Sequence, residues 1–119
     1  MRADNLAREI GAELCSAGAG EMAEIERVYA GDRMSDLLHE VDDHTLLVTN
    51  LAHRVLIRPI ELVDVAGICL LNGATADPEL VAAAAEHGAV VMVSPDGMYE
   101  TCGRLYAALE GRKAGESRR

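Results

Sequence analysis

The chain has 119 residues, half of them hydrophobic, and a mass of 12.7 kDa, which is enough for one compact domain with its own core. No hydrophobic stretch approaches the ~20 residues that a membrane-spanning helix needs, and the charged opening segment Met1–Asn5 is unlike a secretory signal. The formal net charge of −9, together with the absence of Phe and Trp, argues against a protein that binds nucleic acid.

The charge is distributed unevenly along the chain. Residues 1–110 carry seven basic and 19 acidic side chains, whereas residues 111–119 carry four basic side chains and one acidic one. The last nine residues are also rich in Gly and polar groups, a composition typical of a disordered chain end. We therefore expect a single domain over 1–110 and a disordered basic tail over 111–119.

The first half of the chain predicts two helices and two strands. Leu6, Ile10 and Leu14 recur every four residues, with acidic residues between them, as on an amphipathic helix. Asp32 precedes the second helix and is a candidate N-cap. The predicted elements are a helix over 4–16, a strand near 25–29, a helix over 33–40 and a strand near 46–49.

The segment 52–65 contains Pro59 among hydrophobic residues at helical spacing. Proline lacks the backbone N–H that the interior of a helix uses, but it fits the first turn of a helix well. We therefore predict two pieces, the first over 52–57, either helical or extended, and the second a helix over 59–65.

The remaining elements alternate between strand and helix. Asp77-Pro78-Glu79 is a strong helix start, because it combines an N-cap acid, a proline at the first helical position and a further acid in the first turn. The predicted elements are a buried strand near 67–71, a helix from Pro78 that stops at Gly88, a buried strand near 90–93 and a helix over 97–109.

Hydrophobic strands between helices are typical of a parallel sheet with both faces covered. We predict an α/β domain of three layers with a mostly parallel sheet of four or five strands. The residues predicted to be buried in its core are Leu47, Ile68, Leu70, Val91 and Val93.

Small polar or charged residues follow each predicted strand. The carboxyl ends of parallel strands open onto one edge of a sheet, so we expect these residues to gather there as a ligand site. Arg33, at a helix start, suits a phosphate or carboxylate. The same residue types also end strands and cap helices without any ligand, and this alternative stays open. The candidate ligand-binding residues are Asp32, Arg33, Thr49, Asn50, Asn72, Gly73 and Ser94.

The sequence shows no motif that would carry catalysis. It contains no Walker A run, no G-x-G-x-x-G motif in a strand–helix context and no G-x-S-x-G elbow. The four histidines lack metal-ligand spacing, so we expect no metal and no cofactor. Three cysteines, Cys15, Cys69 and Cys102, form no C-x-x-C pair, which fits a reducing cytoplasm better than a disulfide framework.

Five segments carry a family resemblance, and they are Val28–Arg33, Leu46–Asn50, Ile68–Gly73, Val93–Pro95 and Glu100–Tyr106. These segments resemble the DRTGG domain family, which is similar to the N-terminal domain of HPr kinase/phosphorylase and, more distantly, to that of Mur ligases. The resemblance spans about residues 22–109. Met34-Ser35-Asp36 stands where the family has T-G-G, so no role of that glycine pair carries over to this chain.

The resemblance implies an α/β fold of the HPr-kinase N-domain type, a cytoplasmic setting and a regulatory or binding role without kinase activity. One interpretation is a regulatory module that binds a nucleotide or another small anion at the strand ends. The alternative is an interaction or oligomerisation module that docks on a partner enzyme, for example in a hydrogenase-related system.

We also expect a homodimer. Tyr99 and Tyr106 lie two helical turns apart in the sequence, and tyrosine is enriched at interfaces. Packing of both rings against the chain's own core is the alternative.

Overall fold

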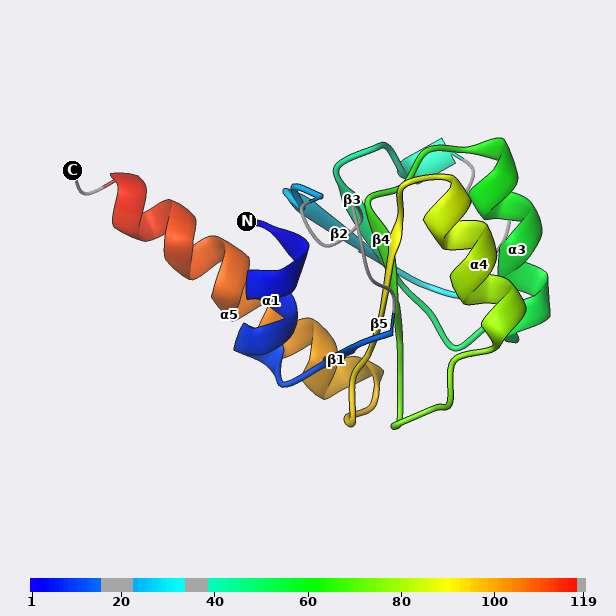
Figure 1. Ribbon diagram of the computed structural model, residues 1–119. Helices are drawn as coiled ribbons and strands as arrows, with labels where there is room; N and C mark the ends of the chain where they lie inside the picture. Colours follow the sequence, from blue (N-terminus) through cyan, green and yellow to red (C-terminus); the bar gives the residue numbers. More distant parts are fainter. Residues whose placement is uncertain (16–22, 34–38, 118–119) are drawn as a thin grey trace.

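The computed structural model describes residues 1–15, 23–33 and 39–117, with side chains as far as Gly111. A five-stranded sheet lies between two layers of helices (Figure 1). Its strands are β1 (Glu13–Leu14), β2 (Arg27–Ala30), β3 (Thr45–Val48), β4 (Gly67–Leu70) and β5 (Val90–Val93). The helices are α1 (Ala3–Ile10), α3 (His53–Leu62), α4 (Pro78–Glu86) and α5 (Met98–Ser117).

The order of the strands is β1-β5-β4-β3-β2. Strands β2 to β5 are parallel and lie side by side in chain order, and β1 pairs antiparallel with β5. Parallel neighbours need a crossover, usually a helix, and α3 and α4 provide two of them. Each of the four predicted strands lies within two residues of the observed one, so the predicted three-layer α/β class is confirmed.

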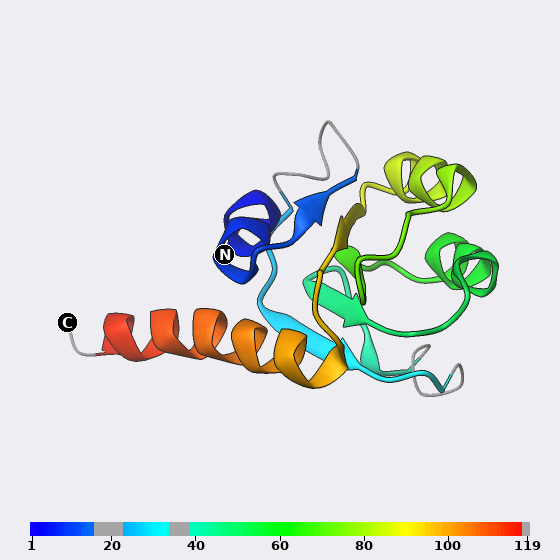
Figure 2. The ribbon, with the colours of Figure 1, turned by 90° about the horizontal axis from the view of Figure 1, so that it is seen from below.

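Helices α1 and α5 cover one face of the sheet, and α3 and α4 cover the other (Figure 2). Successive strand residues point to opposite faces. Leu46 therefore belongs to the core beneath α1 and α5, whereas Leu47 belongs to the core beneath α3 and α4. The five predicted core residues are all buried, and all of them lie on the α3–α4 side.

The predicted helix over 4–16 is too long, because α1 ends at Ile10. Gly11 follows in the left-handed conformation with φ 71°, and its N–H bonds to carbonyl groups of the last turn. The chain then forms β1, in which Leu14 lies opposite Met92 of β5. Leu14 continues the helical spacing of hydrophobic residues, but it is a strand residue that packs against the same core.

The predicted break at Pro59 is also wrong, because α3 is one helix with this proline inside it. Leu56, Pro59 and Ile60 are buried on the side of α3 that faces the sheet. Their packing outweighs the ~3 kcal/mol that a proline costs inside a helix. The helix ends soon afterwards, where the Val63 N–H donates to the carbonyl oxygen of Pro59 (2.9 Å).

The start of α4 agrees with the prediction. The Asp77 carboxylate accepts a hydrogen bond from the Glu79 N–H (2.8 Å), and Pro78 is the first helical residue. The chain turns away at Gly88, which has a φ of 72°.

Two other predicted helices do not match the structure over their full length or lie partly outside the described residues. Helix α5 continues to Ser117, past the predicted end at 109 and into the segment 111–119 that was predicted to be a disordered tail, while the domain boundary at residue 110 stays a prediction. Most of the predicted helix over 33–40 lies outside the described residues, of which His39 and Glu40 are helical. In the part of the chain that the structure describes, no helix is long and hydrophobic enough to cross a membrane.

Candidate functional site

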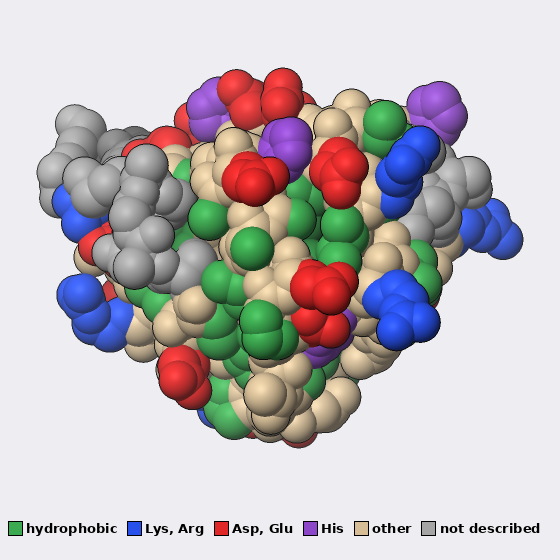
Figure 3. Space-filling model, turned by 45° about the vertical axis from the view of Figure 1, so that its right-hand side comes forward, with side chains coloured by type: hydrophobic (Ala, Val, Ile, Leu, Met, Phe, Trp, Pro, Cys, Tyr) green, Lys and Arg blue, Asp and Glu red, His purple; other side chains and the backbone are tan. Residues whose placement is uncertain are grey.

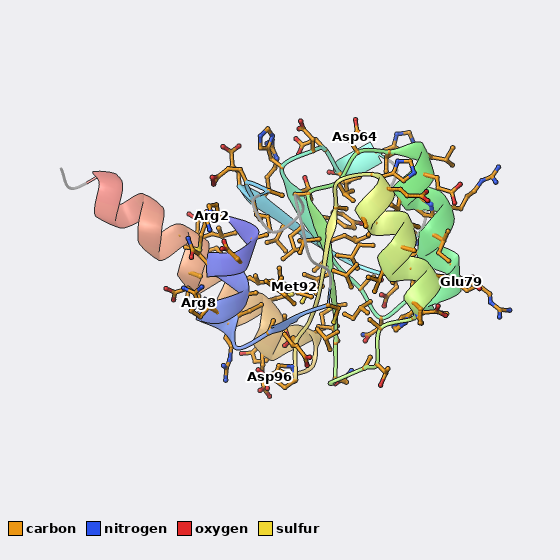
Figure 4. The ribbon with its side chains drawn as sticks, in the orientation of Figure 1. Arg2, Arg8, Asp64, Glu79, Met92 and Asp96 are labelled. Carbon is orange, nitrogen blue, oxygen red and sulfur yellow. The ribbon has the colours of Figure 1, made fainter. Side chains whose placement is uncertain are left out.

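The predicted ligand-binding residues all follow carboxyl ends of the parallel strands. Figure 4 shows this edge at the bottom of the molecule, where Asp96 lies just beyond β5, and Asp64, which precedes β4, lies at the opposite edge. The edge carries two hydrogen-bonded groups. We call them the β2–β3 group, formed by Asp32, Thr49 and Asn50, and the β4–β5 group, formed by Asn72, Gly73, Ser94, Asp96 and Thr101.

In the β2–β3 group, the carboxylate of Asp32 ties two loops together. Its Oδ1 atom accepts hydrogen bonds from the Thr49 hydroxyl (2.8 Å) and from the Asn50 N–H (2.7 Å). Thr49 is buried, and its hydroxyl oxygen also accepts the Leu51 N–H (3.1 Å). Within the described residues, Oδ2 of the exposed Asp32 makes no hydrogen bond, so this oxygen can accept one from a ligand.

Arg33 is exposed and follows Asp32 directly. Asp32 and Arg33 therefore place a carboxylate and a guanidinium on consecutive residues of one loop at this edge. The helix N–H groups that Asp32 would cap belong to residues 34–38, which lie outside the described residues, so the predicted N-cap stays a prediction.

In the β4–β5 group, Asn72 and Gly73 reverse the chain after β4. Both have left-handed backbones, with φ values of 58° and 64°, a conformation that Asn and Gly adopt most readily. The Asn72 N–H donates to the Asp96 carbonyl oxygen (2.9 Å), and the Gly73 N–H donates to that of Ser94 (2.8 Å). These residues form a turn, and the Asn72 side chain remains exposed.

Ser94 and Thr101 join the end of β5 to the first turns of α5. Both are fully buried, and their hydroxyl oxygens lie 2.7 Å apart. The Ser94 hydroxyl oxygen also accepts the Asp96 N–H (3.1 Å). Ser94, like Thr49, therefore holds a loop in place from inside. A ligand at this edge would meet the exposed members, which are Asp32, Arg33, Asn50, Asn72 and Gly73.

The connections after β4 and β5 diverge to opposite faces of the sheet. The chain leaves β4 toward α4 and leaves β5 toward α5, which cover different faces (Figure 1). Ligands of open α/β sheets bind outside strand ends where neighbouring connections diverge in this way. The β4–β5 group occupies this position.

The predicted ligand-binding residues include neither Asp96 nor Thr101, although Asp96 belongs to the polar turn Ser94–Gly97 that follows the last predicted strand. The carboxylate of Asp96 lies just before α5, where the helix dipole favours negative charge. Its Oδ2 atom is 3.3 Å from Nε of Arg104, and it is buried there without a hydrogen bond from any described residue. Thr101 could have been recognised from the sequence, because it places a hydroxyl group about one turn inside the helix that follows Ser94-Pro95-Asp96.

The three cysteines are not activated as nucleophiles. Burial raises the pKa of the Cys69 thiol to about 12 and is also the first cause of the raised pKa values of Cys15 and Cys102. A raised pKa lowers the fraction of reactive thiolate at neutral pH.

A turn before β3 brings Asp42, Asp43 and His44 together, with possible ligand atoms within 4.8 Å of one another. Asp42 already pairs with Arg27 (2.5 Å) and accepts a hydrogen bond from the Thr45 hydroxyl (2.8 Å). The Thr45 bond is the main cause that lowers the pKa of Asp42. We assign this carboxylate to the turn rather than to a metal.

Two tyrosines of α5 face solvent. Tyr99 is 91% exposed and Tyr106 is 71% exposed. The alternative in which both rings pack against the chain's own core is therefore wrong. On the face that α3 and α4 cover, Figure 3 shows several acidic side chains along the top, with hydrophobic side chains and further acidic ones interspersed below them.

No protein-family model and no curated protein sequence matches this chain. Its fold is similar to that of a solved structure, the CBS and DRTGG domains of the regulatory region of a Clostridium perfringens pyrophosphatase in complex with the activator diadenosine tetraphosphate. The TM-score is 0.67 at 14% sequence identity. The similarity covers 87% of this chain and 45% of the other, so this chain spans less than half of that structure's length.

Proposed function

We propose that this chain is a regulatory domain without catalytic activity, which binds a nucleotide or another small anion at the carboxyl edge of its sheet. A regulatory region that binds a dinucleotide activator has a similar fold, which supports this class of function. We also propose membership of the DRTGG family over residues 22–109, the N-domain type of HPr kinase, one domain over 1–110 and a cytoplasmic location.

The observation that carries the proposal is that Asp32 and Arg33 are consecutive, exposed residues of one loop at the strand ends. A guanidinium group can form two parallel hydrogen bonds to a phosphate. A carboxylate at a strand end is the usual acceptor for ribose hydroxyls in nucleotide-binding sheets, and Oδ2 of Asp32 has that capacity. Together the two side chains match the two polar parts of a nucleotide.

Nucleotide binding should appear as thermal stabilisation that depends on Arg33. A ligand at 100 times its dissociation constant adds about 2.7 kcal/mol to the free energy of unfolding, which raises the Tm by several degrees. We expect this shift with at least one member of a panel of mononucleotides, dinucleoside polyphosphates and inorganic phosphate. Arg33→Ala should abolish the shift and leave the ligand-free Tm within a few degrees.

The matched control for that experiment is Arg58→Ala, which removes an exposed arginine from the second half of α3, where the helix runs back toward the opposite edge of the sheet. This control changes the net charge by the same amount as Arg33→Ala, and it should keep the full ligand-induced rise in Tm. If binding survives Arg33→Ala, or if that variant unfolds, Arg33 is a structural residue and the proposed site is wrong.

The exposed tyrosines favour a second candidate function, an interaction or oligomerisation module. We expect a homodimer in which Tyr99 and Tyr106 contribute to the interface. Light scattering at micromolar concentration should give about twice 12.7 kDa for the chain and a monomer for the Tyr99→Ser/Tyr106→Ser variant. A 12.7 kDa particle for the unmodified chain would rule the dimer out.

A further inference from the structure

A groove of about 970 Å³ runs between β2 and α5. Figure 2 shows the two elements next to each other, with α5 extending along the edge of the sheet. Val28 and Ala30 line this β2–α5 groove from the strand, and Cys102, Leu105 and Leu109 line it from the helix. The groove therefore combines a strand edge with a hydrophobic helix surface.

The outer edge of β2 presents backbone groups to the groove that pair with no residue in the described part of the chain. The Arg27 N–H donates to the His44 carbonyl oxygen and the Gly31 N–H to that of Val48, so alternate residues of β2 face β3. In a parallel ladder the residues between them face the other way. The N–H and C=O groups of Val28 and Ala30 thus point outward, and β2 is the last strand of the described sheet.

The charges around the groove are mainly negative. Its two cations are each paired with a carboxylate, since the Met1 ammonium contacts Glu24 and Arg27 contacts Asp42. The other charged side chains on the described lining are Glu26 and Glu110, which are both acidic, and Glu110 has a further partner within the chain. An occupant with positive charge would complement this rim.

We propose that the β2–α5 groove binds an extended, basic segment of a partner protein, which adds to the sheet as a further strand beside β2. Strand addition to a free edge supplies affinity through backbone hydrogen bonds, and alternate side chains supply specificity. One set of those side chains would contact Cys102, Leu105 and Leu109 of α5. Lys or Arg side chains of the segment would meet Glu26 and Glu110.

A second copy of the chain fits this groove less well than a basic partner. Two-fold pairing of β2 with the β2 of another copy would place two acidic rims together, in a chain with a net charge of −9. The expected dimer through Tyr99 and Tyr106 does not require the strand edge, but Tyr106 also lines the groove, so the dimer and the segment would compete for this residue. The inference rests on the second candidate function, and its failure would leave both the nucleotide shift and the tyrosine-dependent dimer unaffected.

The probe is a pool of acetylated octapeptides in which Lys or Arg alternates with Val, Ile, Leu or Thr. Titrated into the full-length ¹⁵N-labelled chain, it should shift the amide resonances of Val28 and Ala30 by NMR. A matched pool with Glu in place of Lys and Arg should bind at least about tenfold more weakly. Two further pools carry N-methyl groups on one or the other alternate set of residues. Methylation of the set that faces β2 should abolish binding, and methylation of the other set should not.

Variants of the chain test the strand edge and the charges separately. Ala30→Pro removes an outward N–H that the sheet does not use, as edge strands tolerate, and should abolish binding without lowering the Tm by more than a few degrees. Ala30→Val keeps the N–H and should retain binding. Glu26→Lys/Glu110→Lys should weaken binding about tenfold or more. The control Glu61→Lys/Glu86→Lys makes the same change in net charge at exposed sites of α3 and α4. It should not weaken binding.

Three outcomes would overturn the proposal. The first is no amide shift at about 1 mM peptide. The second is equal binding of the basic and acidic pools, or equal binding of the two N-methylated pools, which would exclude charge recognition or strand addition. The third is a dimer that Ala30→Pro converts into a monomer, which would show that another copy of this chain occupies the groove.

Discussion

Replacing Ile68 with alanine should lower the free energy of unfolding by about 2–5 kcal/mol. Ile68 has no exposed surface and lies on β4, between Leu47 of β3 and Val91 of β5. Its side chain belongs to the core that α3 and α4 cover. The truncated side chain would leave a cavity that the parallel strands on both sides cannot fill, because their backbones are held by hydrogen bonds.

Urea denaturation followed by circular dichroism measures this loss. Leu62→Ala is the matched control, because it removes a side chain of the same size from a position of α3 that is 63% exposed. It should change the stability by no more than ~0.5 kcal/mol. A loss of that small size for Ile68→Ala would place Ile68 at the surface and contradict the packing described above.

Replacing Gly67 with alanine should destabilise the domain by about 1–3 kcal/mol, although it adds one carbon atom. A Cβ atom at Gly67 would lie 2.4 Å from Cγ1 of Val90 and 2.8 Å from the Val90 carbonyl oxygen. The side chain of Val90 can rotate, but its carbonyl group belongs to the backbone of β5. Strands β4 and β5 must therefore separate locally to accept the methyl group.

The control for this substitution is Gly103→Ala on α5, where a Cβ atom would meet no described atom within 4 Å apart from its chain neighbours and the backbone of its own helix. Because alanine favours a helix over glycine, this variant should gain up to about 1 kcal/mol. Thermal and urea unfolding of the two variants should move in opposite directions. A Gly67→Ala variant as stable as the unmodified chain would mean that β4 and β5 lie further apart than described here.

The predicted core covers one face of the sheet and omits the other. Leu47, Ile68 and Val91 were predicted, whereas Leu46 and Met92 were not, although both are fully buried. The strands are hydrophobic at every position, so their sequences do not show which residues a given helix covers. The positions of α1 and α5 decide that Leu46 and Met92 are buried.

The candidate site, like the core, was only partly predictable from the sequence. Parallel strands share a direction, and for this reason alone Asp32, Thr49 and Asn72 could be assigned to one edge before any coordinates were known. The bonds from Thr49 and Asn50 to Asp32 join residues 17 and 18 positions apart. Such contacts leave no periodic signal, so the sequence could not distinguish a buried loop anchor from an exposed ligand contact.

The sequence by itself determined the α/β class, the four parallel strands and the start of α4, because each depends on local chemistry. Hydrophobic runs form strands, and Asp77-Pro78 begins a helix wherever it is placed. Only the tertiary structure decided that Leu14 is a strand residue, that Pro59 remains inside α3 and that Ser94 is buried against Thr101. In each case, packing against an element distant in sequence outweighs the local preference of the residue. The free energy of that packing depends on residues far along the chain, so the neighbouring residues do not indicate it.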